Sequence, residues 1–407
     1  MTDNNENKVL NVPHLRFPEF SGEWEIYPLT DFMSFKNGMN PDAKRFGRGT
    51  KFISVMDILN NQFICYDNIR ASVEVVDGDI ETYGVNYGDI LFQRSSETLE
   101  DVGQANVYLD SKPAVFGGFV IRGKSKSNYY PMFFRYLLAS PTARKKIIVK
   151  GAGAQHFNIG QDGLSKVCLN IPSIQEQEKI AKLFECIDTR IATQNKIIED
   201  LKKLKSAIVE MLLCNQNGES FKLRDVGCFV RGLTYANEDV TENKAATTVI
   251  RANNLNYGNN VDKDEVVYVN KTPTTSQILR KGDIVICMAN GSSSLVGKNS
   301  YYPFNDGQST IGAFCGIYRT SYPFVKWLMQ SQRYKRLVYQ SLQGGNGAIA
   351  NLNGDDILNM SFPLIENGKS QSIIFAIDAI EKSLMVNKSL QRLYYTQKSY
   401  LLKQMFI

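Results

Sequence analysis

The chain repeats itself at an interval of about 194 residues, and this duplication limits its fold more than any other feature of the sequence. Leu29 and Gly88-Asp-Ile return 194 residues later as Leu223 and Gly282-Asp-Ile. Further matches follow in the same order: Phe35 and Gly38 with Phe229 and Gly232, Phe116-Gly-Gly-Phe with Ile311-Gly-Ala-Phe, Asn158 with Asn351, and Lys205-Ser with Lys398-Ser. Matches in one order at a nearly constant offset indicate an internal duplication, so we expect two modules of one fold.

Each repeat has two parts of different character. The first part, about 150 residues long, contains short runs typical of strands and one segment typical of a short helix. These runs are 51–55, 90–92, 116–122 and 284–287, and the helical segments are 130–147 and 324–342. The second part is a long helical segment. The predicted fold class is therefore α+β, with two duplicated mixed α/β domains and two long helices.

The two long segments have the spacing of helices that pack along a seam. Residues 175–214 contain no Pro or Gly. Their apolar side chains, together with the polar Gln194 and Lys205, fall at alternating intervals of four and three, a heptad pattern. The expected seam residues are Ile180, Phe184, Ile187, Ile191, Ile198 and Leu201 in the first helix and Ile377, Leu384, Leu393 and Leu401 in the second. Ser173 and Glu176 have the spacing of a capping box. Two readings stay open: the helices pair with each other as an antiparallel coiled coil, or each covers its own domain.

These features divide the 407 residues into five parts. The expected divisions are 1–19 (N-terminal segment), 20–174 (first domain), 175–214 (first helix), 215–365 (second domain) and 366–407 (second helix).

Composition excludes several classes of protein. The seven cysteines stand singly without a C-x-x-C motif, and there are only two histidines, so we expect reduced thiols and no metal site. No apolar run approaches the ~18 residues of a membrane span, and the polar start lacks a secretory signal. We therefore expect a cytoplasmic protein. The net charge of +6 permits nucleic acid as a partner without requiring it.

Possible catalytic motifs fail in detail. Residues 291–299 are similar to a phosphate-binding P-loop, but five residues separate the two glycines and Asn299 stands where Ser or Thr would bind magnesium. His156 has Ile349 in the corresponding place of the second repeat, so it is no repeated catalytic base. The acidic pairs 262/264 and 355/356 are better explained as turn or helix caps. We expect no catalytic residues in this chain.

Polar, glycine-containing loops remain, and they correspond between the repeats. Asn, Gln and Arg can make paired contacts to base edges, and glycine lets a backbone approach a ligand closely. Taken singly, such loops are better explained as ordinary turns. Their presence in both repeats favours DNA binding. The candidate DNA-binding residues are Lys44, Arg45, Arg48, Arg94, Ser95, Lys150, Gln155, His156, Asn158, Arg231, Asn290, Ser292, Lys298, Asn346 and Asn351.

Several segments resemble the specificity subunits of type I restriction–modification enzymes. The opening Pro13-His-Leu-Arg-Phe-Pro-Glu-Phe-Ser-Gly-Glu-Trp24 is similar to the start of that family. Ile171-Pro-Ser-Ile-Gln-Glu-Gln-Glu-Lys-Ile180 is similar to the beginning of its first long helix, and Leu401-Leu-Lys-Gln-Met-Phe406 to its C-terminal signature. The resemblance covers essentially the whole chain. One departure lies at 366–371, where the second helix lacks the Pro-x-x-x-Glu-Gln-Glu pattern of the first.

The resemblance implies two target-recognition domains separated by two long antiparallel helices. It implies that each domain recognises one half of a split, asymmetric double-stranded DNA site. It also implies that the helices bind two methyltransferase (modification) subunits and that up to two restriction subunits can join. S-adenosylmethionine, ATP and Mg would then be bound by those partners and none by this chain. The alternative from another class is a non-catalytic protein-binding scaffold with two repeats on a helical spacer.

Overall fold

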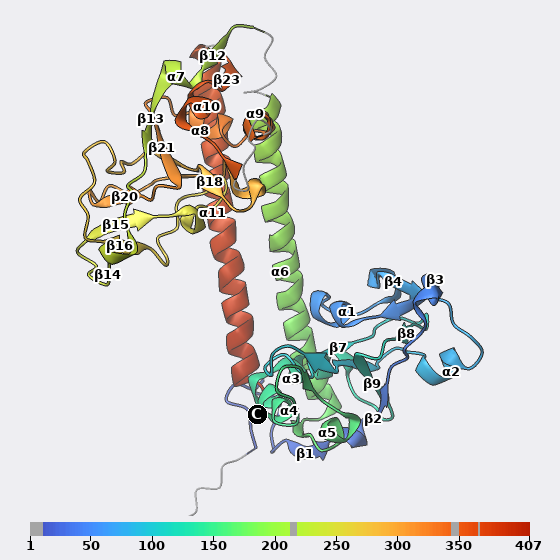
Figure 1. Cartoon of the computed structure of the whole chain (residues 1–407). Coiled ribbons are helices and arrows are strands. Elements are labelled where there is room, and N and C mark those ends of the chain that lie inside the picture. The colour runs from blue at the N-terminus through green and yellow to red at the C-terminus, as the bar shows by residue number, and fades with distance from the viewer. Residues whose placement is uncertain (1–10, 212–217, 343–349, 365–366) are drawn as a thin grey trace, which may run out of the picture. The chain divides into compact units, whose positions relative to one another are not determined.

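The computed structural model describes residues 11–211, 218–342, 350–364 and 367–407. The chain divides into two compact units: unit 1 consists of Met1–Lys196 with Ser389–Ile407, and unit 2 of Ile197–Lys388. Both long helices, α6 (Ile174–Val209) and α11 (Asn367–Gln404), contribute one part to each unit (Figure 1).

The strands of unit 1 form two main sheets and two short pairs. One sheet has the order β2 (Met33–Asn37), β9 (Val120–Ser125), β5 (Ile90–Gln93), β7 (Ala105–Val107). The other has the order β4 (Ala71–Val73), β3 (Phe46–Ile53), β8 (Val115–Phe116). The antiparallel pairs are β1 (Glu25–Pro28) with β11 (Cys168–Ile171), and β6 (Ser95–Ser96) with β10 (Phe157–Asn158).

Unit 2 has the same sheet plan. Its sheets have the orders β13 (Gly227–Arg231), β21 (Cys315–Thr320), β17 (Ile284–Cys287), β19 (Asn299–Tyr301) and β14 (Val240–Thr241), β16 (Val267–Val269), β15 (Thr247–Ile250), β20 (Ser309–Ile311). The pairs are β12 (Ser220–Lys222) with β23 (Ser361–Pro363), and β18 (Ala289–Asn290) with β22 (Ala350–Asn351). Apart from β14, each strand has a counterpart in unit 1, so the sequence repeat is a repeat of topology.

The remaining helices are short. They are α1 (Val55–Asn60), α2 (Asp79–Tyr83), α3 (Pro131–Ala139), α4 (Pro141–Ile148) and α5 (Gln161–Ser165) in unit 1, and α7 (Leu223–Val226), α8 (Val325–Leu328), α9 (Gln332–Leu342) and α10 (Gly354–Leu358) in unit 2. The expected single helix over 130–147 is wrong. Proline at Pro141 cannot continue α3, and Ser140 instead caps α4 by accepting a 3.2 Å hydrogen bond from the Ala143 N–H. The segment 324–342 is likewise two helices, α8 and α9.

The repeated Gly-Asp-Ile motif leads into an inner strand of one sheet in each unit: β5 begins at Ile90 and β17 at Ile284. Gly88 and Gly282 adopt φ of +89° and +104°, a region that favours glycine. The buried Asp89 carboxylate accepts hydrogen bonds of 3.0 Å from the Asn86 and Ser125 backbone N–H groups. Burial raises the pKa of Asp89, and these two hydrogen bonds oppose that rise.

A second repeated feature is a close approach of two glycines. A Cβ at Gly38 would lie 2.0 Å from the Gly117 carbonyl oxygen, and one at Gly232 would lie 2.1 Å from the Gly312 carbonyl oxygen. A side chain at Gly38 or Gly232 would therefore force the backbones apart. The same turn interrupts the strand expected over 116–122, which becomes β8 and β9.

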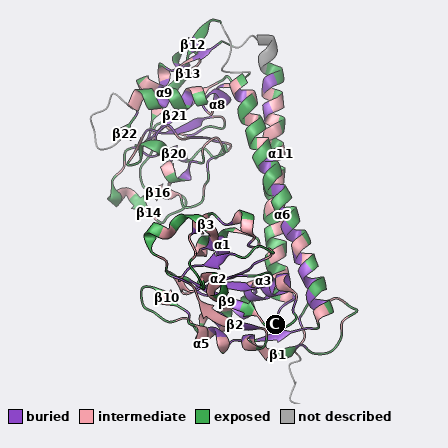
Figure 2. Ribbon diagram, turned by 90° about the vertical axis from the view of Figure 1, so that its right-hand side faces the viewer, coloured by how far each residue is buried: buried purple, intermediate pink, exposed green. Residues whose placement is uncertain are grey.

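The long helices pack antiparallel within each unit. In unit 1, Lys398 bonds to Asp188 and Gln391 bonds to Asn195. Residues later in α6 thus contact residues earlier in α11, as antiparallel helices do. In unit 2, Lys205 pairs with Glu381, and Val209 shares a core cluster with Ile377. Buried and exposed residues alternate along both helices (Figure 2). The predicted fold class is confirmed, and pairing of the helices is the correct one of the two readings.

Nine of the ten residues expected in the seam are buried or half-buried. Ile180, Phe184, Ile187, Ile191, Ile198, Ile377 and Leu384 are buried, and Leu201 and Leu401 are half-buried. Leu393 is 64% exposed, so its assignment to the seam is wrong. Ile377 and Leu384 are seven residues apart, and the next two positions at this interval are Gln391 and Lys398. These two polar residues bond to side chains of α6. The expected first helix, 175–214, begins at Ile174, and its last residues, 212–214, lie outside the described ones.

The start of α6 is attached to the N-terminal segment. The Glu176 N–H lies 3.4 Å from the Ser173 hydroxyl, as a cap requires. The Glu176 side chain, however, is buried and accepts hydrogen bonds from Arg16 (2.8 Å from Nε and from Nη2) and from the Trp24 indole (3.3 Å). The expected capping box is therefore only half formed, because a charged partner takes the carboxylate.

Candidate nucleic-acid interface

In unit 2 the loops that follow several strands surround a cavity of about 580 Å³. Its walls are polar and aromatic side chains with small residues between them. They are Tyr235, Asn237, Arg251, Ala252, Asn253, Ala289, Asn290, Gly291, Gly312, Ala313, Phe314 and Cys315. A concave site with amide, guanidinium and aromatic groups suits a nucleobase, which has a flat face and hydrogen-bonding edges.

Phe314 stands out in this cavity because it is 69% exposed. Its carbonyl oxygen accepts hydrogen bonds from the Met288 N–H (2.8 Å) and the Ala289 N–H (3.3 Å), so the loop that carries the ring is tied to the end of β17. Nearby, the Nε atom of Arg251 is buried and has no hydrogen-bond partner among the described residues. The cavity thus combines a free aromatic face with an unused donor.

Unit 1 exposes an aromatic ring at the equivalent position. Phe119 is also 69% exposed, and it follows the Gly117-Gly118 turn as Phe314 follows Gly312-Ala313. Its carbonyl oxygen accepts a 2.9 Å hydrogen bond from the Arg94 N–H, and Arg94 Nη1 donates to the Gly118 carbonyl at 3.3 Å. The guanidinium of Arg94 is therefore held beside the Phe119 loop.

The β6–β10 pair brings further candidates to the same loops in unit 1. The Ser95 hydroxyl bonds to the Asn158 side chain, and Asn158 Nδ2 lies 3.3 Å from the His156 carbonyl oxygen. The Ile159 N–H donates to the Arg94 carbonyl at 2.9 Å. Arg94, Ser95, His156 and Asn158 are thus brought together with Phe119.

The equivalent strand pair in unit 2, β18–β22, shows which residue of unit 1 corresponds to Asn290. Asn290 lies opposite Ala350 in β18–β22, as Ser96 lies opposite Phe157 in β6–β10. The structural counterpart of Asn290 is therefore Ser96, whereas Arg94 corresponds to Met288. Each unit thus presents different hydrogen-bonding groups on the same frame.

Other candidates lie apart from these clusters or have partners. Arg45 donates to the Glu74 carbonyl at 2.8 and 2.6 Å and pairs with Asp79, and Arg48 pairs with Glu74 at 2.8 Å. The backbone N–H of Val76, and the Arg45 side chain, hold the pKa of Asp79 below its usual value. Lys44, Lys150, Gln155 and Ser292 are exposed.

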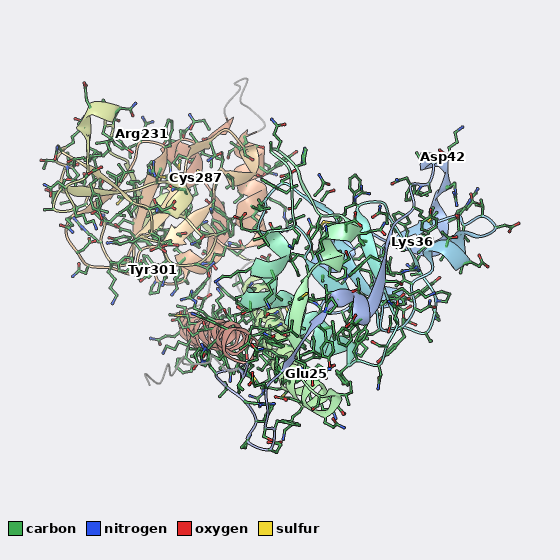
Figure 3. All side chains as sticks on the ribbon, turned by 90° about the horizontal axis from the view of Figure 1, so that it is seen from below. Glu25, Lys36, Asp42, Arg231, Cys287 and Tyr301 are labelled. Carbon is green, nitrogen blue, oxygen red and sulfur yellow. The ribbon has the colours of Figure 1, made fainter. Side chains whose placement is uncertain are left out.

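In unit 2, Arg231 is exposed at the end of the edge strand β13, whereas Cys287 lies in the central strand β17 (Figure 3). Asn351 is exposed in β22. Lys298 is half-buried and lines a different hollow from the one that contains Phe314. Asn346 lies outside the described residues.

The sequence did not single out the residues that define the site best. Phe119, Phe314, Arg251 and Tyr235 were not among the candidates. The signal for the two phenylalanines was present, because the Gly-x-Phe pattern recurs in both repeats, but only the structure shows that both rings are exposed.

Two buried cysteines lie at the Phe314 cavity: Cys315 lines it, and Cys287 lies opposite Cys315 in the neighbouring strand. Burial raises the pKa of the Cys287 thiol and raises that of Cys315 to about 12, so both stay protonated at neutral pH. Within the described ranges, no cluster of three or more His, Cys, Asp or Glu residues could hold a metal ion. In the same part of the chain, no helix is long and apolar enough to cross a membrane.

Comparison with known proteins gives a consistent family. Residues 21–203 match the family described as the type I restriction modification DNA specificity domain. The putative type I restriction enzyme MjaX specificity subunit of Methanocaldococcus jannaschii is 27% identical over 54% of this chain and 53% of its own length. The MjaVIII specificity subunit of the same organism is 22% identical over 70% of this chain and 67% of its own length. The chain thus spans about half to two thirds of these curated relatives.

A solved structure has the same fold. The S subunit of a type I restriction–modification system from M. genitalium superposes with a TM-score of 0.54 at 14% sequence identity, over 97% of this chain and 99% of that one. At this identity the match concerns the fold, and it extends over both repeats and both long helices.

Proposed function

We propose that the chain is a type I restriction–modification specificity subunit and that it recognises DNA within such a complex. It is the subunit that selects the sequence and performs no chemistry itself. S-adenosylmethionine, ATP and Mg belong to its partner subunits, and the complex acts in the cytoplasm. The partners are two modification subunits and up to two restriction subunits.

The observation that carries this proposal is the duplicated loop cluster. Phe119 and Phe314 are equally exposed at equivalent positions, and each lies beside a short strand pair that carries polar side chains. Stacking on an aromatic ring is independent of sequence, whereas hydrogen bonds to base edges are not. The common ring therefore supports DNA binding in both units, and the differing polar groups supply sequence recognition.

The differences between the clusters predict an asymmetric, two-part site. Unit 1 offers Arg94 and Asn158, and unit 2 offers Arg251 and Asn290. In the major groove, arginine favours guanine and asparagine favours adenine. The arginine and the asparagine of unit 1 occupy different positions in the repeat from those of unit 2. The two halves of the DNA site therefore need not match.

The long helices supply a surface for the modification subunits. Leu393 and Tyr400 of α11, both in unit 1, lie seven residues apart, and both are exposed. Residues at this interval lie on one helix face, so they form an apolar stripe. Exposed apolar stripes rimmed by polar residues are typical of protein-binding surfaces.

The proposal is tested by mapping methylated adenines in a genome. The cells would carry the modification subunit with this chain, with a chain lacking residues 20–170, or with no specificity subunit. We expect one two-part motif that needs the intact chain. Methylation at the same motif without the chain would refute the proposal.

A further inference from the structure

A second polar cavity, of about 360 Å³, lies within unit 2 between α6, α11 and the loop before β16. Lysines and uncharged polar groups make up most of its wall. The lining residues are Lys202, Lys205, Ser206, Val209, Tyr257, Gly258, Asn259, Gln330, Lys335, Glu381, Leu384 and Lys388. A neighbouring hollow of about 490 Å³ shares Tyr257, Asn259, Glu381 and Lys388 with it and adds Lys298.

The charges in this cavity do not balance. Four of its lining residues are lysines, and Glu381 is its one carboxylate. Glu381 already forms an ion pair with Lys205. Of the other lysines, Lys388 lies 3.3 Å from Asn259 Oδ1, and Lys335 stands 4.9 Å from the centre of the Tyr257 ring. Lys202 interacts with Glu199, which does not line the cavity. Among the nearby carboxylates that do not line it, Asp378 pairs with Lys326, whereas Glu210 accepts a hydrogen bond from the Gln332 N–H and keeps its charge.

Burial increases the cost of this excess positive charge. Lys205 is largely buried, and this burial lowers its pKa despite the Glu381 carboxylate, with Lys326 and Lys388 acting in the same direction. Like charges repel more strongly where water is excluded. An anion in the cavity would relieve that repulsion.

The cavity also offers uncharged donors. The Tyr257 hydroxyl is buried and has no hydrogen-bond partner among the described residues. Ser206, Asn259 and Gln330 line the same wall. Lysine ammonium groups together with Ser, Asn, Gln and Tyr side chains are the groups by which proteins hold phosphate oxygens.

We propose that this lysine-lined cavity of unit 2 binds a phosphate group. Two sources share that chemistry, the backbone of a DNA duplex and a free phosphate. The position of the cavity favours the backbone, and this choice rests on the proposed function. Asn253 lines the Phe314 cavity and Asn256 lines the hollow beside the lysines, and three residues of chain span at most ~11 Å. A phosphate held here would therefore position the strand whose base meets Phe314.

Unit 1 does not repeat this arrangement. The counterpart of Lys205 is Lys398, which pairs with Asp188, and Glu185 adds a second carboxylate to that region. Phosphate binding at this position is therefore expected in unit 2 only.

The test compares the whole chain with the double variant Lys335→Gln/Lys388→Gln. Both lysines are exposed at the cavity wall, so the melting temperature should not change. The control, Lys244→Gln/Lys271→Gln, removes two exposed charges of unit 2 that do not line the cavity. Binding to duplexes with and without the methylated motif is measured over a range of salt concentrations. We expect the cavity variant to weaken binding to both duplexes alike and to lower the salt slope by about 0.9, the value for one phosphate contact.

A second arm uses inorganic phosphate alone, at constant ionic strength, and follows tryptophan fluorescence. Trp327 reports on the cavity, because the Lys205 ammonium stands 4.6 Å from its ring centre. Loss of the phosphate response with unchanged DNA binding would assign the site to free phosphate, and loss of DNA binding on all sequences would assign it to the backbone.

The proposal is overturned by a variant that keeps both the DNA salt slope and the phosphate response. If that variant also loses a modification subunit, the cavity holds an acidic protein surface instead. Failure of the proposed function has a different signature: the wild-type chain would show no sequence preference, while its phosphate response still depended on Lys335 and Lys388.

Discussion

Lys398 of α11 lies 2.5 Å from a carboxylate oxygen of Asp188 of α6, and its ammonium group stands 5.5 Å from the centre of the Tyr136 ring. Its counterpart in the repeat, Lys205, pairs with Glu381 and stands 4.6 Å from the Trp327 ring. In each unit, one lysine thus joins the two long helices to an aromatic residue of the mixed α/β domain. The duplication therefore extends to the contacts that attach each domain to the helices.

Replacing Asp188 by Asn should destabilise unit 1. The carboxylate is buried and also accepts a 2.8 Å hydrogen bond from the Tyr136 hydroxyl. The substitution leaves Lys398 without its charged partner in a half-buried place, at a cost of about 1–3 kcal/mol. Urea denaturation of the chain measures this loss. The control Glu199→Gln breaks the exposed pair of Glu199 with Lys203 on the same helix and should have no measurable effect. Equal effects of the two substitutions would show that the helix contact adds nothing.

Replacing Leu393 by Ser should leave the chain stable and weaken its binding to modification subunits. The side chain is 64% exposed, so little apolar area is lost from the fold. Its position on the same exposed helix face as Tyr400 predicts a loss of about tenfold in affinity, equivalent to ~1.4 kcal/mol. Calorimetric titration with the modification subunit checks this. A lower melting temperature with unchanged affinity would show that Leu393 packs between the two helices and does not contact a modification subunit.

Replacing Phe119 by Ala should weaken DNA binding without changing stability. Stacking of one base on an aromatic ring contributes ~1–3 kcal/mol, so we expect a loss of roughly tenfold or more. The matched control is Tyr87→Ala, because Tyr87 is an exposed aromatic residue at the opposite end of β5. If the two variants bind DNA equally well in the assembled complex, the exposed ring has no part in recognition.

Asp306 should make the stability of unit 2 depend on pH in the acidic range. Burial raises the pKa of Asp306, but hydrogen bonds from Lys263, Ser309 and Tyr302 outweigh it and lower the pKa to about 2. The unfolded chain has a value near 3.9. Because the folded pKa is the lower one, the stabilisation is complete above pH ~4 and is lost as the pH falls towards 2.

That stabilisation is on the order of 1–2 kcal/mol, since Asp306 is partly exposed. Denaturation between pH 2 and 5 should show a steeper pH dependence for the wild-type chain than for Asp306→Asn. Parallel curves would contradict the assignment.

The sequence predicts the features that depend on local pattern. The repeat, the mixed domains and the long helices follow from spacing and hydrophobic period, which side-chain burial imposes directly. Contacts between distant residues leave no such pattern. The partners of Arg45 are Glu74 and Asp79, and nothing local distinguishes Arg45 from a DNA-binding arginine. Leu393 was misplaced because the seam passes through polar Gln391 and Lys398, which a search for apolar residues excludes.

The candidate site was predicted in part for the same reason. Arg94, Ser95, Asn158 and Asn290 were found because they are polar residues in glycine-containing loops. Phe119 and Phe314 were missed because an apolar residue after a strand is usually buried. Each ring follows a turn at which two backbones approach closely, Gly38 with Gly117 and Gly232 with Gly312, and this close approach of distant segments leaves no local pattern.

The central claim is that each repeat recognises its own half of one DNA site. It is tested most directly by replacing residues 20–170 with the matching segment of a specificity subunit whose methylated site is known, and then sequencing methylated adenines across a genome. The account predicts a hybrid motif in which one half-site is exchanged and the other is unchanged. A motif in which both halves change together, or neither changes, would contradict it.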